Sequence, residues 1–142
     1  MTFAKSKKYL KKIVESSVYD VADITPLSPA GHLSKETKNN IFLKREDLQP
    51  IFSFKLRGAY NKISHLKKLD KVERVITASA GNHAQGVAYS AKKLRLKASI
   101  VMPVTTPSIK VSAVKNLGAQ VILVGDTYDE AYEHAIKLSK KL

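Results

Sequence analysis

The stretch RVITASAGNHAQGVAYSAKKLRLKASIVM, residues Arg74–Met102, decides the fold class. It begins and ends with short apolar runs, Arg74–Ala78 and Ala98–Met102, and these runs predict two strands. Between them, apolar residues recur at the spacing of one helix face, at Ala84, Val87, Ala88, Ala91 and Leu94. A strand, a helix and a second strand in this order predict parallel strands joined by a right-handed crossover.

The same alternation continues toward the end of the chain. Thr106 and Pro107 suit the N-cap and the first turn of a further helix, which Gly118 would close. A third strand is predicted at Val121–Val124, and Asp126 is placed to cap a last helix. The apolar stripe of that last helix consists of Tyr128, Ala131, Tyr132, Ala135 and Ile136.

The chain before this region is interpreted from the same periodicities. A helix is predicted over Lys7–Asp20, an extended stretch over Thr25–Pro29, a turn at Lys38–Asn40 and a short strand at Ile41–Leu43. One face of a further helix is formed by Leu56, Ala59, Tyr60, Ile63 and Leu66. The predicted fold class is therefore α/β, an open parallel sheet with flanking helices.

Composition and charge indicate which partners and which cellular location to expect. The formal net charge is +13, yet only four of the 25 basic residues are arginines, and the lysines are spread along the chain. Because nucleic-acid surfaces favour the planar fork of arginine, we interpret most lysines as solvated helix faces and expect no nucleic acid partner. A more acidic remainder outside these residues is a second explanation. The sequence has no cysteine, no apolar run of membrane-spanning length and no signal-peptide pattern, so we expect a cytoplasmic protein without a membrane partner.

Lys55 is the first candidate for chemistry. It falls at the expected start of a helix and follows Phe52 and Phe54. A helix N-terminus and apolar neighbours both disfavour an ammonium ion, and a neutral lysine amine can form an imine with a carbonyl compound. An ordinary exposed lysine in a first turn explains the same local pattern, so this alternative stays open.

The turn Thr77–Gly86, TASAGNHAQG, is the second candidate, because it follows a strand and opens a helix. Ligands of such sheets bind beyond the carboxyl ends of the strands, where the free N–H groups of a helix N-terminus attract anions. Its glycine spacing matches neither a nucleoside-triphosphate loop nor a dinucleotide fingerprint. An ordinary helix cap with tight packing is the alternative. The four histidines show no metal-ligand spacing, so no metal site is predicted.

Two long blocks of the sequence carry a family resemblance. KREDLQPIFSFKLRGAYNKI, Lys44–Ile63, is similar to a cofactor-lysine motif, and TASAGNHAQGVAYSAKKL, Thr77–Leu94, to a loop that contacts a substrate carboxylate and a cofactor ring. A third block, Val101–Gly125, is also similar, and the likeness extends over nearly the whole chain from Thr25. Together these blocks resemble the fold-type II pyridoxal-phosphate enzymes, and within them the biosynthetic threonine dehydratases.

The resemblance implies a role for individual residues. Lys55 would hold pyridoxal 5′-phosphate through an imine and, once displaced by the substrate amine, would remove the proton from Cα. Phe54 would pack beside the cofactor, and Asn82 would donate a hydrogen bond to the oxygen on the cofactor ring. The substrate-carboxylate site would be lined by Ser79, Ala80, Gly81, Asn82 and His83.

The resemblance also implies a reaction. L-threonine would lose water and then ammonia to give 2-oxobutanoate, a step of isoleucine synthesis, with L-serine as a second substrate. The cofactor would serve as the electron sink. The full-length form would be a homotetramer.

The chain departs from the family pattern in one respect. Its six glycines include no adjacent pair, although the family holds the cofactor phosphate with a run of glycines. We therefore expect an N-terminal portion of a longer enzyme that is inactive by itself. Residues 53–142 would form the small α/β subdomain, and residues 1–52 would belong to an incomplete larger catalytic domain. The alternative is a non-catalytic remnant, or an α/β domain that binds an anion or a partner.

Overall fold

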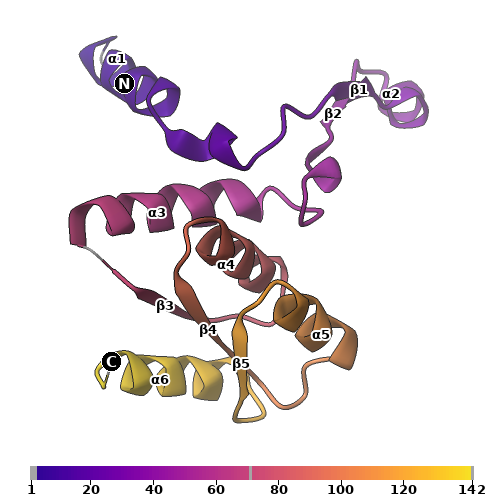
Figure 1. Ribbon diagram of the computed structural model, residues 1–142. Helices are drawn as coiled ribbons and strands as arrows, with labels where there is room; N and C mark the ends of the chain where they lie inside the picture. The colour runs from indigo at the N-terminus through magenta and orange to yellow at the C-terminus, as the bar shows by residue number, and fades with distance from the viewer. Residues whose placement is uncertain (1–2, 71, 142) are drawn as a thin grey trace.

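The computed structural model describes residues 3–70 and 72–141, and Figure 1 shows how its helices surround a sheet. Three parallel strands form this sheet in the order β3-β4-β5. The strands are β3 (Arg74–Ala78), β4 (Lys97–Met102) and β5 (Gln120–Leu123). The surrounding helices are α3 (Lys55–Asp70), α4 (Asn82–Lys93), α5 (Ser108–Asn116) and α6 (Tyr128–Ser139). The predicted α/β class is confirmed, and the three predicted strands are correct to within one residue.

Successive side chains of β4 point to opposite faces of the sheet, and apolar residues pack on both faces. Ile100 and Met102 pack with residues of α3, α4 and α5, whereas Val101 packs with Ala131 and Ala135 of α6. The three β4 side chains are completely buried, because successive residues of a strand point to opposite faces. Figure 1 shows α6 on the other side of the sheet from α4 and α5. Helices on both faces are the normal cover of a parallel sheet.

The predicted cap of the last helix is wrong by one residue. Thr127, and not Asp126, caps α6: its hydroxyl accepts a hydrogen bond from the Glu130 N–H at 3.3 Å. In return, the Glu130 carboxylate accepts from the N–H groups of Thr127, at 3.0 Å, and Asp126, at 2.6 Å. These bonds also lower the pKa of Glu130. The reciprocal arrangement satisfies more N–H groups than a lone aspartate cap, and this explains the difference.

Removing this cap tests its contribution to stability. Thr127→Ala is expected to lower the free energy of unfolding by about 1 kcal/mol, because the hydroxyl acceptor for the Glu130 N–H is lost. Urea denaturation followed by circular dichroism measures the change. Thr127→Ser keeps the acceptor and is the matched control, so equal losses in the two variants would contradict the capping role.

The start of α5 also differs from prediction by one residue. Pro107 has an extended ψ of 137° and is the N-cap, and its carbonyl accepts from Lys110 at 2.9 Å, so the helix begins at Ser108. The predicted N-cap, Thr106, lies outside the helix, and its buried hydroxyl has no hydrogen-bond partner. Gly118 follows the helix with φ at +89°, which confirms the predicted end.

The first part of the chain departs furthest from prediction. The single helix predicted over Lys7–Asp20 is wrong, because α1 (Phe3–Val14) stops early and a 3-10 turn, η1 (Ser17–Asp20), follows it. Ser16 lies at the break, where its hydroxyl and its N–H both donate to the Ile13 carbonyl, at 2.8 and 3.3 Å. Serine side chains compete in this way with helical hydrogen bonds, and the helix ends there.

A small hairpin-like unit follows. β1 (Leu27–Pro29) pairs antiparallel with β2 (Phe42–Lys44), and α2 (Gly31–Thr37) lies between them. The predicted extended stretch, turn and strand are confirmed here, and Lys38 in the turn has a left-handed φ of 52°. Helix α2 was not predicted. A second 3-10 turn, η2 (Glu46–Leu48), leads toward α3.

Part of this N-terminal region packs on α3. Val21, Ala22 and Ile51 form an apolar cluster with Leu56 and Tyr60 of that helix. Other apolar side chains of the region are exposed, among them Leu10, Ile13, Val14, Ile24, Leu27, Phe42 and Leu43. The assignment of residues 1–52 to a larger domain stays a prediction. Across the described residues, no helix combines the length and the apolar character needed to cross a membrane.

Candidate active site

Two helices meet closely at the point where α3 begins. A Cβ atom at Gly86 of α4 would lie 3.1 Å from the carbonyl oxygen of Lys55 and 3.3 Å from the Cβ of Ala59. Glycine has no side chain, so it permits this approach of the two backbones. The first turn of α3 is therefore held beside the N-terminal half of α4.

A side chain at Gly86 is expected to force the helices apart. Gly86→Val should lower the free energy of unfolding by about 1–3 kcal/mol, the usual cost of overpacking. Gly58→Ala on α3 is the matched control, because an added Cβ there meets nothing within 4 Å. Urea denaturation of both variants makes the comparison. A Gly86→Val protein as stable as the Gly58→Ala protein would show that the close contact has no energetic role.

Lys55 is the first residue of α3, and its backbone carbonyl lies beside Gly86 of α4. Its Nζ is 5.2 Å from the centre of the Phe54 ring, and both side chains are exposed. His83, in the first turn of α4, has a pKa below its ordinary value, first because it is partly buried and second because of the positive charge of Lys55.

That turn presents N–H groups without a protein acceptor. Within the described residues, the backbone N–H groups of Ala80, Asn82 and His83 donate to no other protein group, and the N-cap Gly81 has no side chain to cap the helix. The N–H of Ser79 is engaged, because it donates to the Val101 carbonyl at 3.0 Å. Open N–H groups at the positive end of a helix bind anions such as a carboxylate.

A hydrogen-bond network around Glu46 fixes the segment before α3. Two nitrogens of Arg57 donate to the Glu46 carboxylate at 2.7 and 3.0 Å, and the Thr25 hydroxyl donates to it at 2.6 Å. Gln49 is almost fully buried and exchanges two hydrogen bonds of 2.9 Å with the backbone of Asp23. The hydrogen bonds from Arg57 are the main cause that lowers the pKa of Glu46 to about 2. The network joins η2 to the first turn of α3.

The structure brings most of the predicted site residues together. Ser79, Ala80 and Gly81 form the turn between β3 and α4, and Asn82 and His83 begin α4. Phe54 stands beside Lys55 with 59% of its surface exposed. The Glu46 network was not predicted from the sequence, although Glu46 and Arg57 both lie in the block that carries Lys55. Among the residues with described placement, no group of histidine and carboxylate side chains could hold a metal ion.

Fold and site together define a class of protein: a parallel α/β domain with a lysine at the start of one helix and a turn with open N–H groups at the start of the next. The family model described as "Pyridoxal-phosphate dependent enzyme" matches residues 18–141. The chain belongs to this family.

The chain is also similar to individual proteins over most of its length. The chain is 58% identical, over 94% of its length, to a threonine dehydratase of Nicotiana attenuata, and 55% identical, over 96%, to a biosynthetic L-threonine dehydratase of Burkholderia multivorans. It spans only 22% and 27% of those two proteins. The solved structure of the processed form of threonine deaminase isoform 2 from Solanum lycopersicum matches 99% of the chain with a TM-score of 0.90 and 52% identity, and the match covers 39% of that structure.

The residues of the site fit one end of the family's cofactor. A lysine amine is the group that captures an aldehyde, and the open N–H groups of Ala80, Asn82 and His83 suit the carboxylate of an amino acid bound beside it. The exposed Phe54 ring next to Lys55 offers an apolar flank for a pyridine ring. The donor set thus agrees with pyridoxal phosphate at its aldehyde end.

Proposed function

We propose that this chain supplies the lysine-bearing and substrate-binding part of a pyridoxal-phosphate-dependent threonine dehydratase. The reaction would convert L-threonine to 2-oxobutanoate and ammonia in isoleucine synthesis. The observation that carries the proposal is the close packing of the first turn of α3, which begins with Lys55, against Gly86 of α4, the helix whose N-terminal N–H groups are open. The choice of substrate is supported by the names of the similar Nicotiana and Burkholderia proteins.

Each residue of the site has a task in this proposal. Lys55 would hold the cofactor covalently, and its amine, when released, would take the proton from the substrate Cα. The N–H groups of Ala80, Asn82 and His83 would hold the substrate carboxylate and fix the direction of the Cα–H bond, and Ser79 and Gly81 would complete this turn. When bound, the cofactor supplies the electron sink for the charge left at Cα.

Two further side chains would position the cofactor. The amide of Asn82 is exposed and would donate to the oxygen on the cofactor ring, as the family resemblance implies. Phe54 would cover one flank of the ring and exclude water from the amine of Lys55. L-serine as a second substrate, a homotetramer of the whole protein and a cytoplasmic location stay predictions.

The cofactor phosphate needs a binding group of its own, apart from Lys55 and the α4 turn. The resemblance assigns it to a run of glycines, and none of the six glycines of this sequence has a glycine neighbour. We propose that residues 53–142 act as the small subdomain and that residues 1–52 belong with the larger one. For the 142 residues alone we expect negligible production of 2-oxobutanoate.

The test is selective labelling of Lys55. The chain is mixed with pyridoxal phosphate, the adduct is fixed by hydride reduction, and the modified peptide is identified by mass spectrometry. Labelling concentrated on Lys55 among the 21 lysines is the expected result. Labelling spread evenly over exposed lysines would contradict the proposal. Anion binding at the α4 turn without labelling of Lys55 would favour the alternative, a non-catalytic α/β domain.

A further inference from the structure

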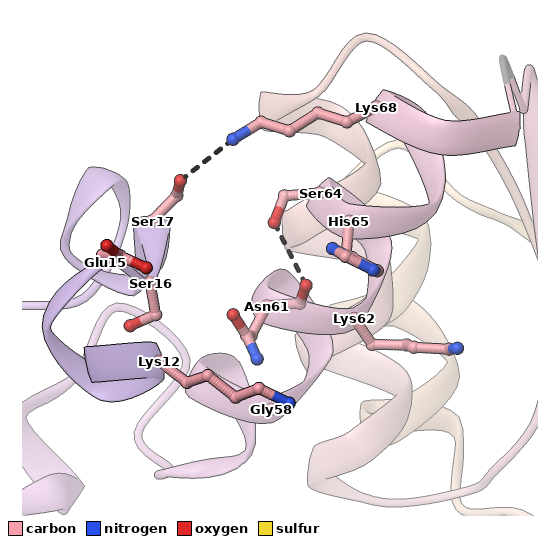
Figure 2. A pocket seen from close by; sticks show the side chains of 10 residues that line it. All are labelled: Lys12, Glu15, Ser16, Ser17, Gly58, Asn61, Lys62, Ser64, His65 and Lys68. Atoms are coloured by element: carbon pink, nitrogen blue, oxygen red, sulfur yellow. Dashed lines mark hydrogen bonds between the residues drawn. The ribbon is translucent and has the colours of Figure 1, made fainter. Parts of the chain in front are cut away.

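A polar cleft of about 460 Å³ lies between the N-terminal region and α3, and Lys55 is not among the residues that line it. Figure 2 shows its two walls. Lys68 extends from α3 to the Ser17 hydroxyl of η1, at 3.3 Å. Lys12 extends the other way, from α1 toward Gly58 of α3 (Figure 2). The two lysines therefore bracket the cleft from opposite walls.

The cleft carries an excess of positive charge. Lys12, Lys62 and Lys68 line it, against the single carboxylate of Glu15, and that carboxylate already pairs with Lys11 at 3.7 Å. Within the described residues, neither Lys12 nor Lys62 forms an ion pair. Lys62 points away from α1 in Figure 2, so Lys12 and Lys68 are the cations on either side of the open space.

Uncharged polar side chains also line the cleft between Lys12 and Lys68. Asn61 of α3 turns its side chain toward Ser16 on the opposite wall (Figure 2), and His65 and Ser17 also line the cleft. The Ser17 hydroxyl accepts from Lys68 and keeps its own proton for an acceptor in the cleft. Ammonium ions with hydroxyl and amide donors can bind a phosphorylated ligand.

A second cavity of about 420 Å³ continues from the first one, because Lys12, Ser16, Gly58 and Asn61 line both. Its other walls are aromatic and apolar. Tyr9 and Tyr19 line this second cavity and are 56% and 61% exposed. The guanidinium of Arg57 lies 5.3 Å from the centre of the Tyr19 ring. A cationic cleft thus opens directly onto exposed aromatic rings.

We propose that the two cavities form one site for a nucleoside di- or triphosphate. Its phosphate chain would lie between Lys12 and Lys68, since several charges along a short chain can meet ammonium ions on both walls. A single carboxylate carries only one negative charge for the two ammonium ions. The flat base would pack against Tyr9 and Tyr19, where aromatic rings bind bases of any sequence. The ligand would join α1 and η1 to α3, the helix whose first residue is Lys55.

Isothermal titration of the chain with ATP, inorganic tripolyphosphate and adenosine tests the site. In about 0.15 M salt, where long-range attraction to a chain of +13 charge is largely screened, ATP is expected to bind saturably at one to one. Tripolyphosphate should bind about tenfold more weakly because it lacks the base. Adenosine should bind more weakly still. Equal affinity for ATP and tripolyphosphate, or no saturable binding of ATP, would overturn the proposal.

Three variants test which residues bind the phosphate chain and which bind the base. Lys68→Gln should weaken both ATP and tripolyphosphate by about fivefold to tenfold, through the loss of one close charge. Tyr9→Ala should remove the preference for ATP and leave tripolyphosphate unchanged. Lys110→Gln on α5, an exposed lysine remote from both cavities, is the control and should change nothing. An equal loss in the control would mean attraction to net charge alone and would overturn the site.

A second measurement needs no variant. Amide chemical-shift changes on adding ATP to the unmodified chain are expected at Ser16, Ser17 and the Gly58–Lys68 part of α3. Shifts confined to the turn at Ala80–His83 would place ATP at the proposed substrate-carboxylate site and would refute this inference, while leaving the proposed function intact.

Discussion

Lys55→Ala is expected to abolish site-selective capture of pyridoxal phosphate by this chain. Lys55 begins α3, whose first turn packs against Gly86 of α4, and alanine offers no group that can form a bond to the cofactor aldehyde. The absorption band of the covalent adduct should disappear, and the peptide containing position 55 should carry no label after hydride reduction. In the whole protein, the proposed function predicts that the same change lowers turnover at least about 100-fold, because it also removes the proposed base for the Cα proton.

Lys62→Ala provides the matched control for this experiment. Lys62 is an exposed lysine of the same helix, two turns further on, so its loss changes the net charge equally. It should keep the adduct band at full strength. An unchanged band in Lys55→Ala, with the fold intact by circular dichroism, would show that another lysine holds the cofactor.

Separating Arg57 from Glu46 is expected to destabilise the fold strongly. The Glu46 side chain is 16% exposed and that of Arg57 is 26% exposed, so a carboxylate left without its partner stays largely desolvated. Arg57→Gln should lower the free energy of unfolding by about 3 kcal/mol, as measured by urea denaturation at pH 7. The first turn of α3 should loosen as well, because Arg57 belongs to it.

A neighbouring ion pair serves as control for this variant. Arg45 contacts Asp47 at 2.7 Å, but these side chains are 37% and 56% exposed. Exposed pairs add little to stability, so Arg45→Gln should leave the unfolding curve almost unchanged. A similar loss in the two arginine variants would mean that burial of the Glu46 pair is irrelevant.

The same pair predicts how stability depends on pH. The pKa of Glu46 is about 2 in the folded chain, below its ordinary value of 4.5, mainly because Arg57 donates to the carboxylate. A lowered folded-state pKa stabilises the fold above about pH 5, and this contribution is lost as the pH falls from 4.5 toward 2. The shift corresponds to at most about 3 kcal/mol.

Glu46→Gln removes the stabilisation that comes from the ionised carboxylate, so a comparison with the wild-type chain measures it. The variant should be less stable than the wild-type chain at pH 7, and the difference should shrink toward zero as the pH approaches 2. Urea denaturation of both proteins between pH 7 and pH 2 measures the difference. A gap that stays constant over this range would show that the ionisation of Glu46 does not stabilise the fold.

Short-range patterns in the sequence predicted much of this structure. The strand at Arg74–Ala78 and the helix with Ala84, Val87 and Ala88 on one face depend on periodicity within a few residues, and both are confirmed. The start of α3 at Lys55 is confirmed for the same reason. The helix caps were harder to predict, because Asp126 and Thr127 are both good cap residues and only the reach of Glu130 decides between them.

The sequence by itself determined the order of parallel strands and helices, and it placed Lys55 and the Ser79–His83 turn at the starts of two successive helices. These features follow from local periodicity and turn chemistry. Only the tertiary structure decided that Gly86 lets those helices touch, that Arg57 bonds to Glu46, and that Lys68 reaches Ser17, 51 positions away in the chain. Such contacts depend on how separate elements pack, and no local pattern encodes the distance between two side chains that meet only when the chain has folded.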